Sequence, residues 1–316
     1  MLIIRAMTPG NPREPRAPRT GSVAIVGRPN VGKSTLLNAL LGERLAITSH
    51  HPQTTRDRVL GVRTDRDAQF VFVDTPGVHQ ARTRLGARMN QEARDAAQGA
   101  DVIVFVTDLT PKRDAELREA DKTILAGLPA GVPVILVLNK VDKLSDKAAL
   151  LDVLAGHARG FAFEAIVPVS ALKKDGLDRI LKEVRDRLPR GEKAYDDDAL
   201  TDRPARFFVR EYVREQILRR TREEVPHGVA VVVDRFDETG KLPKIELSVH
   251  VDREAHKKII VGKGGVLLKE IGSGARRHIE SLLGKQVFLK IWVRVTPGWY
   301  ESAGLLRDMG YGGDDG

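Results

Sequence analysis

Apolar segments and helical patterns alternate over the first two thirds of the chain. Short segments that are apolar at almost every position are Val23–Val26, Phe70–Val73, Val102–Val106, Val134–Leu138 and Ala165–Val169. Apolar residues recur at helical spacing in Ser34–Leu41 and in Leu177–Leu188. Strands that are apolar on both faces and separated by helices are typical of a parallel sheet covered on both sides. The pattern therefore predicts an α/β domain with a doubly wound, mostly parallel sheet over residues 21–190.

The last third of the chain has a different order of elements. The pattern predicts a helix at 204–222, strands at 229–236 and 243–252, helices at 254–261 and 265–283, and a strand at 286–295. Because this α-β-β-α-α-β order does not repeat the first domain's strand–helix unit, we expect a second, smaller α+β domain at 204–296. Residues 191–203 lack periodicity and are predicted to be a linker, and residues 297–316 a C-terminal tail.

Composition narrows the class of protein. The chain has 316 residues, 41% hydrophobic and 30% charged, which suits two globular domains and excludes a wholly disordered or collagen-like protein. The absence of cysteine excludes disulfides and thiolate metal sites. The net charge is +9, and residues 201–300, with 20 basic and 13 acidic residues, carry +7. This concentration favours a polyanion as the partner of the second domain.

The N-terminal segment is unlike the rest. Residues 1–20 contain a proline at every third position, from Pro9 to Pro18, with arginines between them. We predict a disordered, basic Pro/Arg-rich extension. No apolar run approaches the roughly 20 residues of a membrane-spanning helix, and the N-terminus lacks the apolar core of a secretory signal. A cytoplasmic location is therefore expected.

The turn after the first strand has the spacing G-x-x-x-x-G-K-[ST]. Its glycines let backbone N–H groups converge on a phosphate, and the start of the following helix adds positive potential. Lys33 is expected to neutralise the β- and γ-phosphates, and the Ser34 hydroxyl to bind Mg²⁺. The loop alone is compatible with an ATPase, a kinase or a GTPase. The residues predicted to contact the nucleotide are Gly27, Arg28, Pro29, Asn30, Val31, Gly32, Lys33, Ser34 and Thr35.

A D-x-x-G motif follows the strand Phe70–Val73. It consists of Asp74, Thr75, Pro76 and Gly77, and Val78 comes next. We expect Asp74 to hold Mg²⁺ through water and the Gly77 N–H to contact the γ-phosphate. Because that contact exists only while the γ-phosphate is bound, the segment after Gly77 is predicted to be a switch.

An N-K-x-D motif indicates which base is bound. It consists of Asn139, Lys140, Val141 and Asp142 and follows the strand Val134–Leu138. A carboxylate only accepts hydrogen bonds, so Asp142 can receive both guanine N1–H and N2–H₂, a donor pair that adenine lacks. Asn139 is expected to reach the O6/N7 side of the base, and the Lys140 stem to lie along its plane. After the next strand, the loop with Ser170 and Ala171 is predicted to offer a backbone N–H to O6.

A glycine-rich turn separates two helices of the second domain. It fits a G-x-x-G loop, whose glycines let a nucleic-acid backbone approach closely and be clamped over about four nucleotides. Aromatic residues make up only 5% of the chain, so recognition is expected to rest on an apolar groove and on hydrogen bonds to base edges. The residues predicted to bind RNA are Gly262, Lys263, Gly264, Gly265, Lys257, Lys258 and Lys269.

The order of these motifs resembles the translation-factor-type GTPases and, more narrowly, the bacterial Era family, from about residue 21 to 300. Gln53–Asp57 resembles that family's first switch, with Thr55 or Thr54 as the residue for Mg²⁺ and γ-phosphate. Asp74–His79 and the helical spacing that begins at Leu85 resemble its second switch and the helix after it. The second domain, with Val261–Gly265 between helices, resembles its type II KH domain.

The resemblance implies a GTPase that uses GTP/GDP and Mg²⁺ and binds 16S ribosomal RNA near its 3′ end during assembly of the small (30S) ribosomal subunit. A monomer is expected. Two other interpretations stay open. One is a constitutive RNA-binding chaperone whose nucleotide site only stabilises the fold. The other is a membrane-associated regulatory GTPase, linked to growth or cell division and peripheral on the cytoplasmic face of the inner membrane.

Val78 stands where Ras-like enzymes carry a glutamine that orients the attacking water. A valine neither donates nor accepts a hydrogen bond, so we expect slow intrinsic turnover that relies on the backbone, a cation or a partner. The catalytic assignments are therefore Lys33, Thr55 and Gly77. Three histidines near the motifs are candidates for proton transfer or metal binding, but P-loop catalysis needs no histidine, so we expect solvent-exposed loop residues at His50, His51 and His79.

Overall fold

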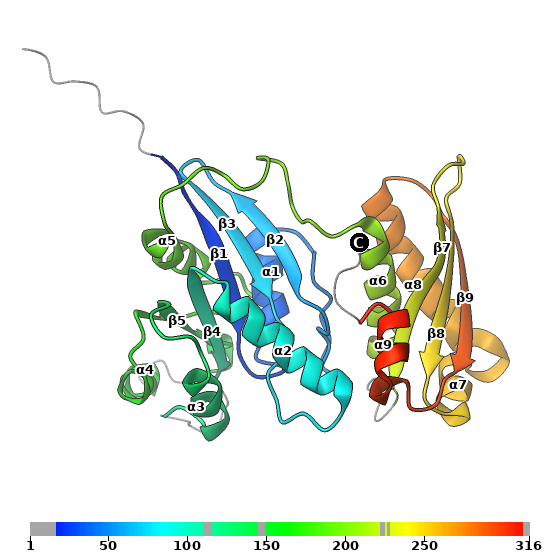
Figure 1. Ribbon diagram of the computed structural model, residues 1–316, viewed down its shortest axis with the longest axis horizontal. Helices are drawn as coiled ribbons and strands as arrows, with labels where there is room; N and C mark the ends of the chain where they lie inside the picture. Colours follow the sequence, from blue (N-terminus) through cyan, green and yellow to red (C-terminus); the bar gives the residue numbers. More distant parts are fainter. Residues whose placement is uncertain (1–16, 110–115, 145–148, 222–224, 226–227, 312–316) are drawn as a thin grey trace, which may run out of the picture.

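The structure is a computed structural model that describes residues 17–109, 116–144, 149–221, 225 and 228–311, arranged as two lobes side by side (Figure 1). The first lobe is built on a six-stranded sheet and the second on a three-stranded sheet. The strands of the first lobe are β1 (Arg19–Val26), β2 (Val59–Thr64), β3 (Ala68–Asp74), β4 (Val102–Asp108), β5 (Val134–Asn139) and β6 (Ala165–Pro168). Its helices are α1 (Lys33–Leu41), α2 (Arg84–Gln98), α3 (Glu119–Ala126), α4 (Ala149–Gly160) and α5 (Leu177–Arg187).

The strand order of the large sheet is β2-β3-β1-β4-β5-β6, and only the β2–β3 pair is antiparallel. The prediction of a doubly wound, mostly parallel sheet is therefore confirmed. Strand β2 was not among the predicted strands, because Gly61 interrupts its apolar pattern. A Cβ atom at Gly61 would lie 2.5 Å from the Leu41 side chain, so the glycine lets α1 pack closely against β2.

Successive residues of the central strands face opposite helical layers. In β1, Val23 and Ile25 belong to the core that includes α1 and α5, whereas Ala24 and Val26 belong to the core that includes α2 and α3. This explains why the strands are apolar throughout. The carboxyl ends of the parallel strands meet at one edge of the sheet, the usual ligand-binding position in such folds.

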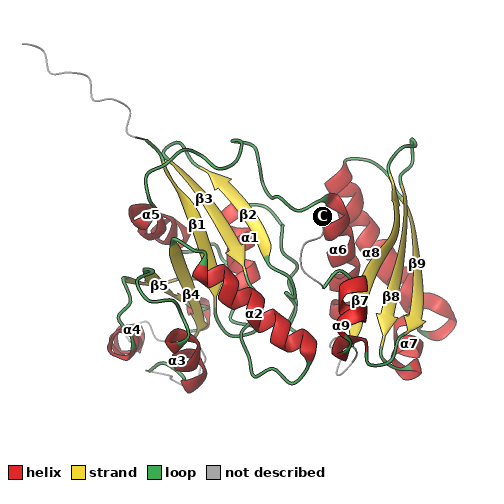
Figure 2. Cartoon of the chain, viewed as in Figure 1, coloured by secondary structure: helices red, strands yellow, loops and turns green. Residues whose placement is uncertain are grey.

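The second lobe has the predicted α-β-β-α-α-β order. Its elements are α6 (Ala205–Arg220), β7 (Val229–Asp237), β8 (Lys244–Val251), α7 (Glu254–Val261), α8 (Val266–Leu283) and β9 (Phe288–Val295). Strand β8 is central, antiparallel to β7 and parallel to β9. Helices α6 and α8 cover one face of this sheet, and both stand between it and the first lobe (Figure 2).

The segments outside the two predicted domains are more ordered than expected. The residues predicted as a C-terminal tail include a 3₁₀ turn, Trp299–Glu301, and helix α9 (Ala303–Asp308), which pack against α2 (Figure 1). Strand β1 begins at Arg19, inside the extension predicted for residues 1–20, and residues 1–16 of that extension lie outside the described residues. The predicted linker is irregular but attached to the sheet, because the Leu200 carbonyl accepts from the Val62 N–H at 2.8 Å.

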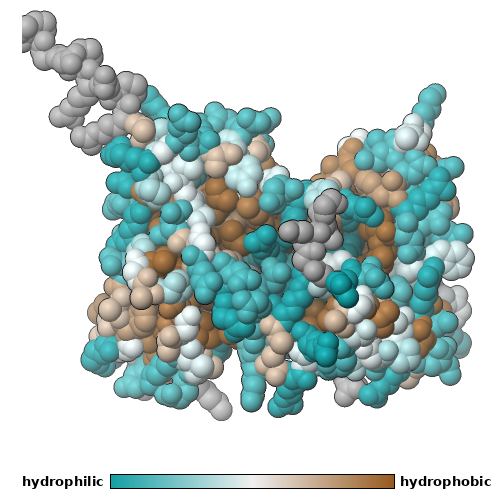
Figure 3. All heavy atoms as spheres, viewed as in Figure 1, coloured by the Kyte–Doolittle hydropathy of each residue, from teal (hydrophilic) through white to brown (hydrophobic). Residues whose placement is uncertain are grey.

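Over the described part of the chain, no helix is both long and apolar enough to cross a membrane. Figure 3 shows a face that is mainly hydrophilic, with apolar residues in separate patches.

Candidate functional site

A cavity of about 700 Å³ opens at the carboxyl edge of the large sheet. It is lined by the loop before α1, by residues 47–55, by Gly77 and by the loop after β5, so the predicted motifs come together around one space. Leu218 and Arg219 of α6 also line it. The second domain therefore borders the nucleotide cavity directly.

The loop between β1 and α1 wraps around the Lys33 ammonium group. Lys33 Nζ donates to the carbonyl oxygens of Gly27 and Arg28 at 3.1 and 3.0 Å. Burial lowers the pKa of Lys33 to about 8, against the opposing effect of the Asp74 carboxylate. Gly27 has a φ of 153°, and a Cβ atom there would lie 2.2 Å from the Val106 carbonyl oxygen, so only glycine fits. Both of these acceptors are uncharged carbonyl groups, so a bound phosphate would give the ammonium group an anionic partner.

Two side chains of this loop point away from the cavity. The Arg28 guanidinium pairs with Asp108 and Asp121 at 3.1 and 2.8 Å, and Val31 is fully buried in the core. Their predicted contact with the nucleotide can therefore come only from the backbone.

Three oxygen-bearing side chains predicted to serve a cation meet at the bottom of the cavity. The Ser34 hydroxyl donates to Asp74 Oδ2 at 2.7 Å, and Thr55 Oγ1 lies 2.8 Å from the Ser34 hydroxyl. Burial raises the pKa of Asp74 to about 6, although Lys33 and the hydroxyl donors lower it. Asp74 Oδ1 is buried and has no hydrogen-bond partner among the described residues. Oxygen ligands with an unsatisfied buried carboxylate oxygen fit a hard divalent cation such as Mg²⁺.

The hydroxyls of the two candidate threonines in the first switch have different hydrogen-bond partners. The Thr55 hydroxyl is buried beside Asp74 and Ser34. The Thr54 hydroxyl donates to the His51 carbonyl at 2.6 Å and bonds to Ser49. Only the Thr55 hydroxyl thus faces the other two oxygen ligands.

Asn139 links three loops at the edge of the cavity. Its Nδ2 donates to the Val31 carbonyl at 2.8 Å, and its Oδ1 accepts from the N–H groups of Lys140 and Ala171 at 2.8 and 3.0 Å. The Val31 contact uses one of the two amide hydrogens, and Asn139 also lines the cavity, so its predicted contact with the O6/N7 side of a base stays a prediction. Asn139 therefore fixes the mutual position of the loops.

The other members of the N-K-x-D motif keep positions suited to a base. Lys140 Nζ donates to the Asn30 carbonyl and to Asp108 at 2.6 and 2.8 Å, so its stem crosses the mouth of the cavity. Asp142 Oδ1 accepts a 2.5 Å hydrogen bond from the Ser170 hydroxyl, which lowers the pKa of Asp142. An ionised carboxylate at this rim can accept from a ligand's N–H groups.

The second switch lies against the phosphate loop. A Cβ atom at Gly77 would be 2.7 Å from the Pro29 backbone, so the chain can pass here only with glycine. The Val78 N–H donates to the Gly27 carbonyl at 3.3 Å, and the Val78 side chain packs on the core beneath α2. Val78 thus anchors the segment and brings no polar group to the cavity.

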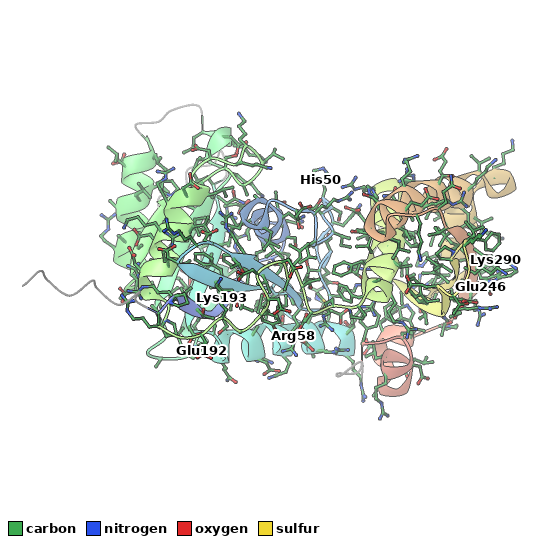
Figure 4. All side chains as sticks on the ribbon, turned by 90° about the horizontal axis from the view of Figure 1, so that it is seen from above. His50, Arg58, Glu192, Lys193, Glu246 and Lys290 are labelled. Atoms are coloured by element: carbon green, nitrogen blue, oxygen red, sulfur yellow. The ribbon has the colours of Figure 1, made fainter. Side chains whose placement is uncertain are left out.

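The nearby histidines do not share one environment. His50 is exposed, as predicted (Figure 4), whereas His51 is only partly accessible, contrary to the expectation, and lines the cavity. His79 was also expected to be exposed, but it is only partly accessible, and both of its ring nitrogens lie within hydrogen-bond distance of protein atoms. The expectation for His79 was wrong because helix α2 and the first switch fold over this loop.

The glycine-rich turn of the second domain forms an exposed tip between α7 and α8. Gly262, Gly264 and Gly265 all have positive φ, at 71°, 62° and 81°, which other residues adopt only with strain. Lys258, Lys263 and Lys269 are exposed around the tip, and Lys257 is half-buried. Two exposed apolar side chains, Ile259 and Val266, flank it. The tip combines cations, glycines and apolar surface, as a backbone-clamping loop requires.

The first switch is held by α6 of the second domain. Arg214 on α6 is fully buried and donates to the Thr54 carbonyl and to the Glu211 carboxylate. Although burial raises the pKa of Glu211, the Arg214 charge and hydrogen bonds hold it below its usual value. Arg214 therefore connects the Glu211 carboxylate on α6 to the backbone of the first switch at Thr54.

A second buried contact between α6 and the first switch lies one helical turn before Arg214. Arg210 donates to Asp57 at 2.8 Å, and Arg56 donates to the Val229 carbonyl at the start of β7. Burial raises the pKa of Asp57 even beside Arg210. Sequence reasoning missed these residues because arginines and carboxylates on a helix suggest a solvent-exposed face. The one sequence feature that could have indicated a buried helix is the pair of aromatic residues at the start of α6, Phe207 and Phe208.

These features define a class of protein: a P-loop GTP-binding domain joined to an RNA-binding domain of the KH type. The family described as 50S ribosome-binding GTPase matches residues 22–140, and the KH domain family matches residues 224–300. Over 93% of the chain, it is 44% identical to GTPase Era of Trichlorobacter lovleyi and 46% identical to GTPase Era of Geobacter metallireducens, covering 98% of each. The chain belongs to the Era family of GTPases.

Solved structures agree over the same length. A variant of Aquifex aeolicus Era bound to GDP and AlF₄⁻ superimposes with a TM-score of 0.88 at 41% identity, covering 93% of this chain and 99% of that one. An Era in complex with MgGDPNP and nucleotides 1506–1542 of 16S ribosomal RNA gives a TM-score of 0.88 at 40% identity, with the same coverage. The similarity therefore includes both domains.

Proposed function

We propose that this chain is a GTP-hydrolysing switch that binds 16S ribosomal RNA near its 3′ end and acts in assembly of the small ribosomal subunit. The convergence of Ser34, Thr55 and Asp74 beside Lys33 carries the nucleotide part of the proposal. The exposed tip at Gly262–Gly265 and the RNA complex of the Era relative support the RNA part. We place the protein in the cytoplasm as a monomer.

In this proposal each predicted residue of the phosphate site has a distinct role. Lys33 neutralises the β- and γ-phosphates, and the backbone N–H groups of Gly27–Thr35 surround them. Ser34 and Thr55 hold Mg²⁺ through their hydroxyls and Asp74 through water. The cation supplies neutralisation of the charge on the transferred phosphoryl group. The Gly77 N–H contacts the γ-phosphate and so reports its presence to the second switch.

The base is selected at the rim of the cavity. Asp142 accepts from guanine N1–H and N2–H₂, and Ser170 keeps its carboxylate ionised and oriented. Asn139 fixes the loops around the base and donates to its O6/N7 side through the second amide hydrogen. Since Val78 provides no group that orients water, intrinsic hydrolysis is slow and rests on Lys33, Thr55 and Gly77.

RNA binding is tested by placing a negative charge on the tip of the second domain. Gly264→Asp has open space around its new side chain, and aspartate tolerates the left-handed backbone found there. We expect at least about a tenfold loss of affinity for RNA from the 16S 3′ end, because the carboxylate repels the phosphate backbone. GTP affinity should not change. Filter binding and a fluorescent nucleotide measure the two.

The matched control is Gly284→Asp. Gly284 has φ of 66° and equally open surroundings, and it ends α8, about 27 Å from the tip. This variant should keep RNA affinity. Equal loss of RNA binding in both variants would contradict a specific role for the tip, and loss of GTP binding in Gly264→Asp would contradict separate sites.

A further inference from the structure

Two polar side chains from different switches meet beside the part of the cavity that Gly77 lines. Gln53 begins the first switch, and His79 follows Gly77 and Val78 in the second. Their Nε2 atoms are 2.8 Å apart, and the other ring nitrogen, His79 Nδ1, lies 2.9 Å from the Gly77 carbonyl oxygen. Gln53 also lines the cavity. These contacts form a bridge between the switches.

The chemistry of the partners determines how the bridge is bonded. The Gly77 carbonyl can only accept, so His79 Nδ1 carries the hydrogen. In a neutral imidazole the second nitrogen is then an acceptor, and the Gln53 amide N–H is the donor that matches it. The order of donation thus runs from Gln53 to His79 to Gly77, and both ring nitrogens of His79 have a partner.

His79 is held from behind by the helix after the second switch. Asn90 on α2 accepts from the His79 N–H at 3.2 Å and donates to the His79 carbonyl at 2.7 Å. The Gly77–Val78 peptide is also fixed at both ends, because the Val78 N–H donates to Gly27 of the phosphate loop. His79 therefore connects α2, which holds its backbone, to the Gly77–Val78 peptide, which its imidazole contacts.

The backbone of Gln53 supports a role for its side chain. Its φ is 61°, a left-handed conformation that few residues other than glycine adopt. Such backbone strain persists mainly where the surrounding structure fixes it, often in switches. Here the strained residue is the one whose side chain reaches His79.

We propose that Gln53 and His79 are positioning residues for GTP hydrolysis. Their bridge holds the first switch against the second, and His79 fixes the Gly77–Val78 peptide so that the Gly77 N–H points at the γ-phosphate. Neither side chain reacts, which explains how a chain with Val78 in place of a glutamine arranges its catalytic groups. This inference rests on the proposed role of Gly77 at the γ-phosphate.

The test is a double-mutant cycle on the full chain. Single-turnover GTP hydrolysis and the affinities for GTP and GDP are measured for Gln53→Ala, for His79→Phe and for the double variant. Each single variant should hydrolyse GTP about tenfold more slowly, and the double variant no more slowly than the slower single one, since residues that act as a unit are not additive. GDP affinity should stay within about twofold, because the bridge adjoins the γ-phosphate. Gln91→Ala, an exposed glutamine beside Asn90 on α2, is the control and should hydrolyse normally.

A further variant separates the bridge from backbone strain. Gln53→Asn keeps an amide and tolerates the left-handed backbone, but its side chain is one methylene too short to reach His79. It should be as slow as Gln53→Ala. Normal hydrolysis by Gln53→Asn, additive losses in the cycle, or equal losses of GDP binding and hydrolysis would each overturn the proposal. Failure of the wild-type chain to bind GTP would instead refute the proposed function.

Discussion

At the scale of single residues, the motifs predicted which atoms meet but not always what each atom does. The carboxylate of Asp142 and the hydroxyls of Ser34 and Thr55 lie at the cavity, where their chemistry is usable. Asn139 in addition bonds three backbone groups of the surrounding loops, a role that its motif did not predict. A motif gives the residue type and the loop, whereas the direction of a side chain depends on neighbours that are distant in the sequence.

Base selectivity can be inverted at Asp142. Asp142→Asn replaces one acceptor by an N–H₂ donor, which repels guanine N2–H₂ but can donate to the carbonyl that xanthine carries there. We expect GTP affinity to fall and affinity for xanthosine triphosphate to rise, each by about tenfold or more, because an unmatched base leaves polar groups unpaired at the contact. Competition with a fluorescent nucleotide measures both. Unchanged GTP affinity would remove Asp142 from the base site.

At the scale of elements, five of the six strands of the large sheet and the elements of the second domain were predictable, because continuous apolar runs or regular apolar spacing mark them, whereas β2 was missed. The predicted bounds of the second domain's elements lie within about two residues of those observed, the usual uncertainty of element ends. The environment of α6 was not predictable. All its residues from Phe207 to Leu218 are buried, the charged ones included, since the helix is enclosed by its own sheet on one side and by the first switch on the other.

Breaking the buried ion pair on α6 should destabilise the protein strongly. Arg214→Met leaves the Glu211 carboxylate buried without its main partner, which costs about 3–5 kcal/mol for a pair of this kind. Urea unfolding measures the loss. The control Lys182→Met breaks an exposed pair on α5 and should leave the free energy of unfolding nearly unchanged, because solvent screens that pair. Adding Glu211→Leu to Arg214→Met should recover most of the loss, and no recovery would mean that the contact with Thr54 dominates.

At the scale of the whole molecule, the two domains share a core. Leu85 and Met89 of α2 belong to the same apolar cluster as Trp299, Met309 and Tyr311 near the C-terminus. The domains are also linked at a second place, where Arg214 and Arg210 of α6 bond to the first switch. The sequence did not predict this coupling, because some of the residues that make it were assigned to a C-terminal tail, and the pattern of the 204–222 helix gave no partner in the first domain. The structure instead predicts that the domains unfold together.

Removing Trp299 should separate the domains thermodynamically. The residue is fully buried between α2 and β7, and its Nε1 donates to the Gly228 carbonyl. We expect the wild-type chain to unfold in one calorimetric transition and Trp299→Ala to unfold in two. The space left by the missing indole weakens the core shared by the domains more than the core of either domain. GTP should then raise only the transition of the nucleotide domain, since a ligand stabilises the unit that binds it.

Trp292→Ala is the matched control for this experiment. Trp292 lies on β9 and is 47% exposed, so its loss leaves the shared core intact and should preserve the single transition. In the Trp299→Ala chain, Trp292 remains as a fluorescent reporter of the second domain alone. If its signal and the GTP-sensitive transition still coincide, the buried charges between the first switch and α6 suffice to couple the domains. Combining Trp299→Ala with Arg214→Met should then separate them.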